Sequence, residues 1–321
     1  MRPRTLLLGL AAFALGCSAP PDESPKELIK VRMSFGKHLS YGPLMVAQAE
    51  GFFRDEGIDL EWVPLVKSAE TLVALITGDI DVRPGPIHAG FLSAIGRQAP
   101  IRIVAGMGNL NAGSCTYYGI ILRPGLDTAG TPKIKRMRAS SDGATRFVVK
   151  HMLAKRNIGI NSLEAVSIPE AVMATALETG ALDAIAVSEP ALTRLRNKGT
   201  FWLSGQDAVP GFQWGVIAFG ERLLTRDREI GTRFLRAYQR GVAQYLQGKT
   251  DRNVAIIAEA TNETVETTRA VCWPDFAPDS RINWESLAAY QDWAVTEGLM
   301  LKAVSRAQAL DSLFVTAPGM P

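Results

Sequence analysis

The sequence predicts an α/β protein built from two doubly wound lobes that are joined by two crossovers, with a helical C-terminal tail packed on the first lobe. Strand-like and helix-like segments alternate through the first two thirds of the chain, a motif recurs about a hundred residues later, and the last third has an almost wholly helical pattern. With 321 residues, of which 47% are hydrophobic, the chain can bury more than one core.

The repeated motif is the strongest of these observations. The stretch LITGDIDVRPGP is followed by a similar stretch, LETGALDAIAVSEP, and equivalent positions lie 102 residues apart: Leu75 and Leu177, Gly78 and Gly180, Asp81 and Asp183. A shared offset indicates two copies of one architecture. In each copy the glycine is expected to end a helix, and the aspartate to begin the next strand in a structural role.

The first copy predicts, in order, a strand, a helix, a strand, a helix, a strand, a helix and a strand, over residues 29–35, 42–56, 58–64, 69–78, 80–83, 86–98 and 101–107. The second copy repeats this order over residues 134–140, 143–157, 163–169, 171–180, 182–187 and 190–199. Strands that alternate with helices favour right-handed crossovers and a largely parallel sheet in each lobe.

A strand that begins at Phe212 is expected to cross back, and the helical remainder to pack on the first lobe. The predicted lobe I therefore comprises residues 29–122 and 217–321, and lobe II residues 123–216. Hinges are expected near residues 122–125 and 214–217.

The N-terminus predicts export. Arg2 and Arg4 precede an apolar run from Leu6 to Leu15 that is too short to span a bilayer comfortably. The following ALGC resembles a bacterial lipobox, although Ala14 departs from the usual leucine, so residues 1–16 are predicted to be a lipoprotein signal peptide and Cys17 the lipidated residue. Residues 17–28 would be a polar, proline-rich tether. A plain cleaved signal, or a disordered start with an accidental cysteine, is the alternative.

Charge and residue counts argue against a nucleic-acid-binding protein and against a metal site. The formal net charge is only +3 and no long basic run is present, which argues against nucleic-acid binding. The three histidines, His38, His88 and His151, lack metal-site spacing, and no cofactor is expected. Cys115 and Cys272 form either a disulfide or two buried thiols, because sequence does not give the distance between them.

Several stretches carry a family resemblance: YGPLMVAQAEGFFRDEGIDLEWVP, LITGDIDV, AIGRQAPIRIVAG and LETGALDAIAVSEP, together with the lipobox. In this order they resemble solute-binding components of ABC importers, in the branch that binds aliphatic sulfonates, nitrate or bicarbonate, or pyrimidine precursors of thiamine. The resemblance covers residues 29–216 and weakens in the tail. It implies a periplasmic binding protein fold of type II, a ligand between the lobes and delivery to a membrane permease.

Loops that follow the carboxyl ends of strands predict where the ligand binds. GKHLSYGP in the first lobe and ASSDGAT in the second place Ser and Gly before a helix, whose free N–H groups hold anions or polar oxygens. Helix capping without a ligand is the alternative for Ser40, Ser141 and Asp142.

Charged and aromatic side chains near these loops are further candidates. Arg83 would pair with a ligand anion or with a neighbouring carboxylate. Glu189 would contact a ligand with N–H donors or open the next helix, and aromatic rings would stack on a flat heterocycle. The candidate ligand contacts are His38, Ser40, Tyr41, Pro84, Gly85, Asn109, Ser140, Ser141, Asp142, Glu189 and Trp214.

The resulting hypothesis is a monomeric, lipid-anchored substrate-binding subunit on the periplasmic or cell-surface side of a bacterial membrane. It binds a small organic solute, either a sulfonate-like anion or a pyrimidine-like heterocycle, and closes to deliver it to the transmembrane subunits of a permease. One alternative is an enzyme similar to thiamine-pyrimidine synthase, against which the export signal and the lack of a reactive constellation count. The other is an extracytoplasmic sensory domain, for which no second module is visible.

Overall fold

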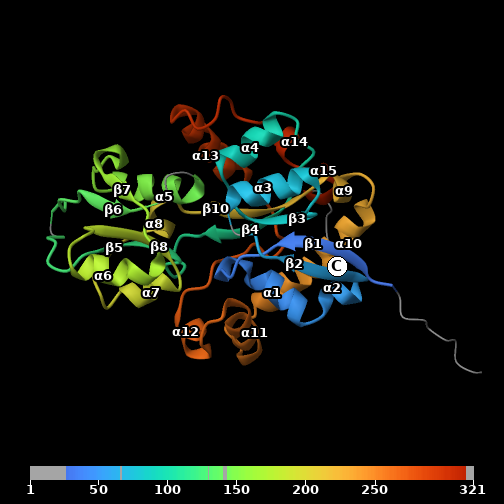
Figure 1. Ribbon diagram of the computed structural model, residues 1–321, viewed down its shortest axis with the longest axis horizontal. Coiled ribbons are helices and arrows are strands. Elements are labelled where there is room, and N and C mark those ends of the chain that lie inside the picture. The colour runs from blue at the N-terminus through green and yellow to red at the C-terminus, as the bar shows by residue number, and fades with distance from the viewer. Residues whose placement is uncertain (1–26, 66, 129, 140–142, 316–321) are drawn as a thin grey trace, which may run out of the picture.

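Two five-stranded sheets form two lobes, as the computed structural model of residues 27–65, 67–128, 130–139 and 143–315 shows (Figure 1). The first sheet has the order β2-β1-β3-β10-β4, with β1 Ile29–Ser34, β2 Ile58–Val63, β3 Val82–Pro86, β4 Arg102–Leu110 and β10 Phe212–Phe219. The second has the order β7-β6-β8-β5-β9, with β5 Tyr118–Leu122, β6 Arg136–Arg138, β7 Glu164–Val166, β8 Ala184–Ser188 and β9 Thr200–Ser204. The predicted two-lobed α/β fold is confirmed.

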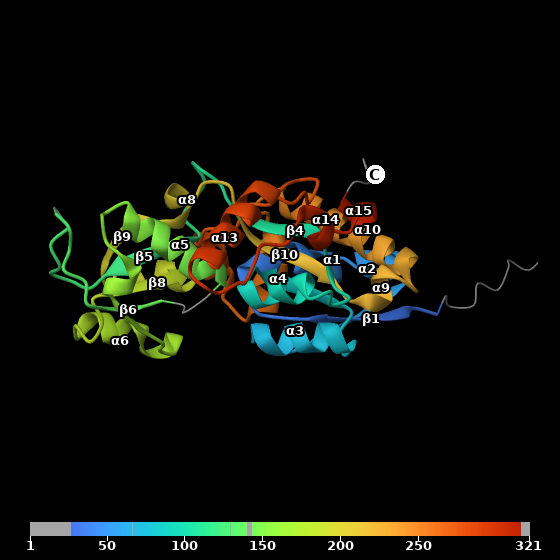
Figure 2. The same cartoon turned by 90° about the horizontal axis from the view of Figure 1, so that it is seen from above.

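Helices cover both faces of each sheet (Figure 2). The first lobe carries η1 Leu39–Tyr41, α1 Gly42–Ala49, α2 Phe52–Asp55, α3 Ser68–Thr77 and α4 Ala89–Gly96. The second carries α5 Gly143–Ala154, η2 Ile160–Ser162, η3 Glu170–Val172, α6 Met173–Glu178, α7 Ala191–Leu195 and α8 Gly205–Ala208. The tail adds α9 Glu221–Leu224, α10 Arg228–Tyr245, α11 Asp251–Thr261, α12 Val265–Ala270, α13 Trp284–Thr296, α14 Arg306–Ala309 and α15 Ser312–Val315.

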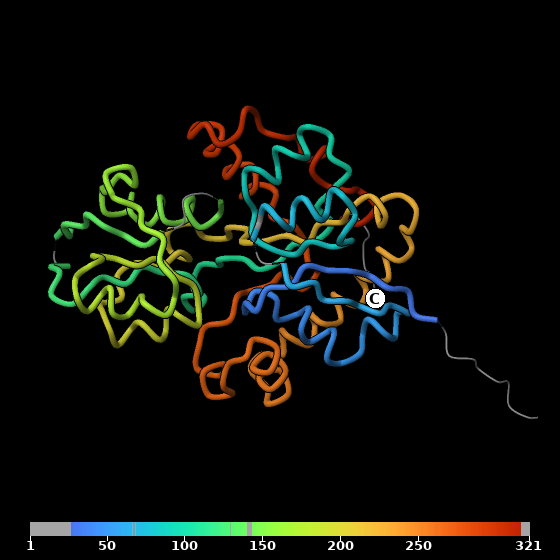
Figure 3. The backbone as a smooth tube through the Cα atoms, in the orientation of Figure 1, coloured from blue at the N-terminus to red at the C-terminus, as the bar shows by residue number. Residues whose placement is uncertain are grey.

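Each sheet contains one strand that arrives from the other lobe. β4 leads across to β5, and β9 leads back to β10, so that two segments of chain cross between the lobes (Figure 3). β5 is antiparallel to β8 and β9, and β10 is antiparallel to β3 and β4, whereas β1 pairs with β2 and β3, and β6 with β7 and β8, in parallel. The sheets are therefore mixed rather than largely parallel.

The crossing segments lie earlier in the chain than the sequence predicted. β5, which the boundary at residue 122 assigns to the first lobe, is hydrogen-bonded within the second sheet, and β10 belongs to the first sheet from Phe212 onward. The crossings are thus residues 111–117 and 209–211. The alternation of strands and helices could not reveal this shift, because both strands are mostly apolar, with Gln213 the polar exception on β10, and give no sign of which sheet they join.

The sequence repeat corresponds to a repeated structural unit. Gly78 and Gly180 both have the positive φ expected after a helix, at +80° and +71°. The Asp81 carboxylate accepts the N–H of Arg32 at 2.8 Å, and the Asp183 carboxylate accepts that of Arg136 at 3.1 Å. Each aspartate therefore fixes the start of its strand beside the parallel neighbour, which agrees with the structural role expected for both.

The helical tail packs mainly on the first lobe. α10 lies against α1 and α2, α14 against α4, and α15 against β4. α10 approaches α1 so closely that a Cβ on Gly241 would lie 2.2 Å from the carbonyl oxygen of Pro43. α13 also touches the second lobe, because Phe147 on α5 packs against Tyr290 and Trp293. Within the described ranges of the chain, no helix is long and apolar enough to cross a membrane.

A disulfide joins the first crossing segment to the tail. Cys115 and Cys272 are bonded, with their Cα atoms 5.6 Å apart and a sequence separation of 157. This outcome decides between the two alternatives that the sequence left open. The bond ties residues 111–117 to the segment that follows α12, and so adds a third covalent connection at the junction of the lobes.

Reduction of this disulfide is expected to destabilise the protein by about 2–5 kcal/mol, because the bond closes a long loop in the unfolded chain. Thermal unfolding of the wild type with and without dithiothreitol measures the effect. The variant Cys115→Ser/Cys272→Ser should melt at the temperature of the reduced wild type and should not respond to the reductant. A wild-type melting temperature that is unchanged by reduction would contradict the bond.

Candidate functional site

The candidate site lies where the two lobes meet, at the ends of β1, β3 and β8. We call it the interlobe cluster and define it by a set of mostly buried side chains: Ser34, Ser40, Tyr41, Arg83, His88, Tyr117, Tyr118 and Trp214. These residues come from both lobes and from the first of the two segments that connect them.

Tyr117 bridges the lobes. Its hydroxyl group is hydrogen-bonded to Ser40, which follows β1, and to Ser188, which ends β8, and burial raises the pKa of this tyrosine to about 12. A phenol with that pKa stays protonated at neutral pH. Ser40 is 4% exposed and is engaged with Tyr117.

Three aromatic rings pack at the same junction. The Trp214 ring on β10 lies 5.8 Å from the Tyr117 ring and 5.1 Å from the Tyr118 ring. Trp214 is only 5% exposed, so most of its surface contacts protein. The Tyr118 hydroxyl is buried and has no hydrogen-bond partner among the described residues.

Arg83 is the buried cation of the cluster, at 1% exposure. Its guanidinium donates to the Thr71 hydroxyl at 3.3 Å and to the Pro86 carbonyl at 3.1 Å, and it lies 5.1 Å from the centre of the Phe91 ring. No carboxylate pairs with it in the described parts of the chain, and its Nη1 has no partner there. Of the two alternatives for Arg83, the ion pair with a neighbouring carboxylate is therefore absent among the described residues.

The charge of Arg83 persists at neutral pH. Burial lowers the pKa of its guanidinium to about 10, although the nearby Tyr41 acts in the opposite direction. A buried charge without an opposite charge is costly, so the residue requires compensation from a source that the described residues do not supply.

His88 adds a neutral donor. Its Nδ1 accepts the backbone N–H of Phe91 at 3.1 Å and so caps α4, which leaves Nε2 to carry the proton. Nε2 is buried and lacks a hydrogen-bond partner in the described residues. Burial, and then the charge of Arg83, lower the pKa of His88 to about 3, so the imidazole is uncharged at physiological pH.

Tyr41, Pro84 and Gly85 form the wall beside Arg83. The Tyr41 hydroxyl donates to the Pro84 carbonyl at 3.0 Å. Gly85 has a φ of +150°, and a Cβ there would meet the Tyr41 hydroxyl at 3.6 Å and Arg83 Nη2 at 3.7 Å. These are ordinary contact distances, so it is the positive φ that favours glycine here.

Glu189 is engaged within its own lobe and with the tail. Its carboxylate accepts the backbone N–H of Thr193 at 2.9 Å, the Thr193 hydroxyl at 2.8 Å and, weakly, the N–H of Cys272 at 3.4 Å. This geometry agrees with the interpretation in which Glu189 opens the following helix. The repulsion that it would exert on a bound anion is reduced by these three donors.

The remaining predicted contacts lie elsewhere. His38 is exposed at the edge of the junction, 6.4 Å from the Tyr41 ring. Asn109 lies on β4 beside the tail, where its N–H donates to Asp275, and it does not join the interlobe cluster. Ser140, Ser141 and Asp142 lie outside the described residues, as does Cys17.

The interlobe cluster offers more donors than acceptors. Arg83 Nη1, His88 Nε2, and the hydroxyl groups of Tyr118 and Ser34 are all buried without partners among the described residues. The first is charged, the second is a fixed N–H donor, and the hydroxyls can donate. Such a set suits an acceptor-rich, anionic group. His88 and Ser34 were missed in the sequence; the signal for His88 was a lone histidine just after the repeated strand and just before a helix.

The lobes also touch outside this cluster. The N–H of Ala144, at the start of α5, donates to the Ile87 carbonyl at 3.0 Å. Arg194 on α7 pairs with Glu263 of the tail at 3.0 Å, and Lys150 on α5 pairs with Glu297 at 2.6 Å. These contacts hold the second lobe against the first lobe and the tail.

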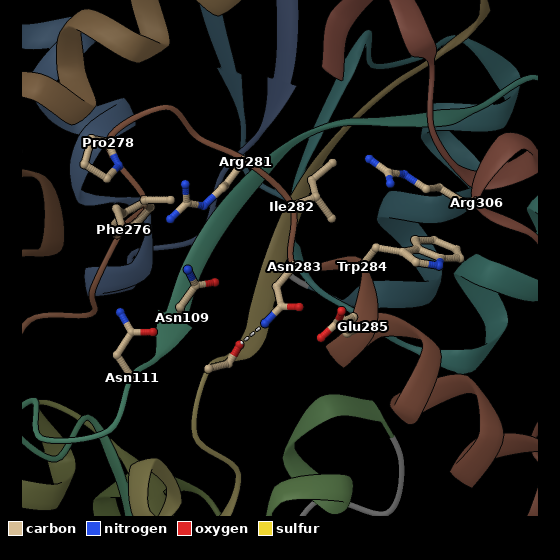
Figure 4. Close-up of a pocket in the computed structure, with 12 residues that line it drawn as sticks. Asn109, Asn111, Phe276, Pro278, Arg281, Ile282, Asn283, Trp284, Glu285 and Arg306 are labelled. Atoms are coloured by element: carbon tan, nitrogen blue, oxygen red, sulfur yellow. Dashed lines mark hydrogen bonds between the residues drawn. The ribbon is translucent and has the colours of Figure 1, made fainter. Parts of the chain in front are cut away.

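A pocket of about 590 Å³ lies beside the two crossing segments (Figure 4). We call it the hinge pocket. Its walls include residues of β4, of both crossing segments and of the tail, namely Asn109, Asn111, Gly211, Arg281, Trp284, Glu285 and Arg306. It shares no residue with the interlobe cluster. In the part of the chain that the structure describes, no group of three or more His, Cys, Asp or Glu residues could hold a metal ion.

Solved structures share this fold. The ligand-binding component of an ABC-type import system from Staphylococcus aureus, solved with zinc bound, is 13% identical with a TM-score of 0.73, covering 91% of this chain and 100% of its own. The periplasmic aliphatic sulphonate binding protein SsuA from Escherichia coli is 15% identical with a TM-score of 0.70, covering 89% and 92%. The periplasmic nitrate-binding protein NrtA from Synechocystis is 16% identical with a TM-score of 0.59, covering 75% and 69%. The periplasmic binding protein fold is thereby confirmed.

Sequence comparisons give the family. Curated protein sequences contain no significant match. A family described as NMT1/THI5 like matches residues 39–249, about two thirds of the chain, which agrees with the branch that the sequence resembles. The chain therefore belongs to the NMT1/THI5-like family.

Proposed function

We propose that the protein is the substrate-binding subunit of an ABC importer and that it binds a small organic anion between its lobes. The observation that carries the proposal is the buried guanidinium of Arg83, which lacks a carboxylate partner in the described residues and lies near the unpartnered Nε2–H of His88. A sulfonate or carboxylate group would supply both the missing charge and the missing acceptors. Neighbours of the same fold that are named for sulphonate and nitrate binding support this class of ligand.

The proposed mechanism is closure around the ligand, without a chemical step. An anion that accepts from Arg83 in the first lobe and from Tyr118 in the second favours the state in which both lobes contact it. Contacts such as the Tyr117 bridge and the Arg194–Glu263 pair then form at the same time. A permease that recognises the closed surface would receive the loaded protein.

We further propose that the protein is exported and held at a bacterial membrane surface by lipid on Cys17. The support is the order of Arg2, Arg4, a short apolar run and the ALGC sequence. A disulfide between Cys115 and Cys272 is compatible with an oxidising compartment.

A thermal-shift screen over sulfonates, inorganic oxyanions and pyrimidines is expected to identify the ligand, because a compound at 100 times its dissociation constant stabilises the folded state by about 2.7 kcal/mol. For the compound found, Arg83→Met should weaken binding about 10- to 100-fold, since a charge-assisted hydrogen bond contributes about 1.5–3 kcal/mol. Isothermal titration calorimetry measures the affinity, and a circular-dichroism melt checks that the variant folds.

The matched control is Arg233→Met, which removes a guanidinium from α10 far from the cluster and should leave affinity unchanged. Wild-type affinity in folded Arg83→Met would remove Arg83 from the site. Conversion of the compound into a product during prolonged incubation would instead favour the enzyme alternative.

The expected pH dependence of binding follows from the shifted pKa values of His88 and Arg83. Because the pKa of His88 is about 3 and that of Arg83 about 10, neither changes charge between these values. Affinity for a sulfonate, which stays ionised, should vary less than about twofold from about pH 5.5 to about pH 8.5, and should fall as the pH rises through 10 and Arg83 loses its proton. Binding that strengthens steadily as the pH falls from 8 to 5.5 would show that a histidine must be protonated.

Lipidation is tested by growing a bacterial host with radiolabelled palmitate. The wild type should incorporate label, Cys17→Ala should lose it, and the matched variant Cys115→Ser should retain it, because only the first of these cysteines follows the signal-like run. Label that persists in Cys17→Ala would contradict lipid attachment at Cys17.

A further inference from the structure

The disulfide between Cys115 and Cys272 joins two segments that belong to different lobes. Cys272 lies in a part of the tail that is fixed to the first lobe. The ring of its neighbour Trp273 stacks on Tyr245 of α10, with 5.2 Å between the ring centres, and the Tyr245 hydroxyl donates to the Pro274 carbonyl at 2.9 Å. The tail side of the bond therefore moves with the first lobe.

Cys115 is attached to the second lobe instead. The side-chain amide of Gln206, on α8, donates to the Cys115 carbonyl at 2.9 Å. Two residues further along, the Tyr117 carbonyl accepts the N–H of Glu189 at 2.9 Å, and β5 of the second sheet begins at the next residue. A rotation of the second lobe away from the first would therefore pull Cys115 away from Cys272, and the covalent bond between them limits that separation.

The other contacts that hold the lobes together outside the crossings are not covalent. One of them reports directly on lobe separation, because the N–H of Ala144, in the first turn of α5, donates to the Ile87 carbonyl of the first lobe at 3.0 Å. An N–H in the first turn of a helix has no partner in its own helix, so the opposite lobe alone protects this amide from solvent. When the lobes separate, the Ala144 N–H is released.

The two bonded residues differ in their access to solvent. Cys115 is exposed, whereas Cys272 is 7% exposed, so an attacking thiolate reaches the bond from the Cys115 side. That thiolate forms a mixed disulfide with Cys115, the bond to Cys272 breaks, and the Cys272 sulfur leaves as a thiolate that takes up a proton. If the reductant is a dithiol, its second thiol displaces Cys115 as a thiol. The dithiol becomes a disulfide, and two electrons and two protons pass to the protein.

We propose that the Cys115–Cys272 bond is a redox-controlled restraint on the separation of the lobes, released by a dithiol reductant such as a thioredoxin-like protein. The intact bond disfavours open arrangements, since a cross-link removes conformations in which the joined segments are far apart. Reduction restores those conformations and shifts the lobes toward the open state. The proposal concerns the lobes themselves and does not rest on the function proposed for the interlobe cluster.

Amide hydrogen exchange tests the restraint without any ligand. In ¹⁵N-labelled protein, the Ala144 N–H should exchange at least about tenfold faster after reduction with dithiothreitol, which corresponds to about 1.4 kcal/mol. The variant Cys115→Ser/Cys272→Ser should show the faster rate both with and without the reductant. Under the same conditions the two thiols should become titratable in protein that keeps its folded circular-dichroism spectrum.

A destabilised variant with the bond intact separates this effect from a general loss of stability. Phe234 is fully buried in the core of the first lobe, against Phe53 and Phe219, so Phe234→Leu should lower the melting temperature and keep the wild-type exchange rate at Ala144. Equal Ala144 rates in the oxidised and reduced protein would overturn the proposal. So would an acceleration in Phe234→Leu that matches the reduced protein, or thiols that appear only in denaturant.

Discussion

The exchange of strands between the lobes is the constraint on which the rest of the structure depends. β10 enters the first sheet from the second lobe, and β5 enters the second sheet from the first, so neither sheet is complete without the crossing chain. The ends of β1, β3 and β8 must therefore face one another across a short junction. Two backbone segments and the Cys115–Cys272 bond are the covalent connections there, which allows the lobes to move relative to each other while their cores stay packed.

Electrostatics at this junction distinguish structural polar groups from those available to a ligand. Asp81, Asp183 and Glu189 have their carboxylates engaged by backbone N–H groups or arginines, so they hold local structure. Arg83 has hydrogen bonds but no opposite charge among the described residues. A folded protein rarely retains a buried, uncompensated charge without a use for it, and under the proposed function a charged ligand would provide that compensation when the lobes close.

The architecture could be predicted from the sequence because the repeat and the hydrophobic periodicity extend over many residues. The roles of Gly78, Gly180, Asp81 and Asp183 followed from the repeat alone. The binding site was harder to predict from the sequence, because whether a residue caps a helix or contacts a ligand depends on partners that are distant in sequence. Glu189 is satisfied by Thr193 and Cys272, and Ser40 by Tyr117, and none of these pairings has a local signal. His88 was missed for the same reason.

The interlobe cluster and the hinge pocket lie next to the same two crossings. Trp214 of the interlobe cluster lies on β10, three residues after Gly211 of the hinge pocket, and Asn109 lies on β4, just before the outgoing crossing. The tail is hydrogen-bonded at these places, because Asn283 donates to Gly211 and to Gln213, and Asp275 accepts from Asn109. A rotation of the lobes at the crossings would therefore take place beside a tail that stays attached to β4 and β10, so the tail helps to decide which relative positions the lobes can adopt.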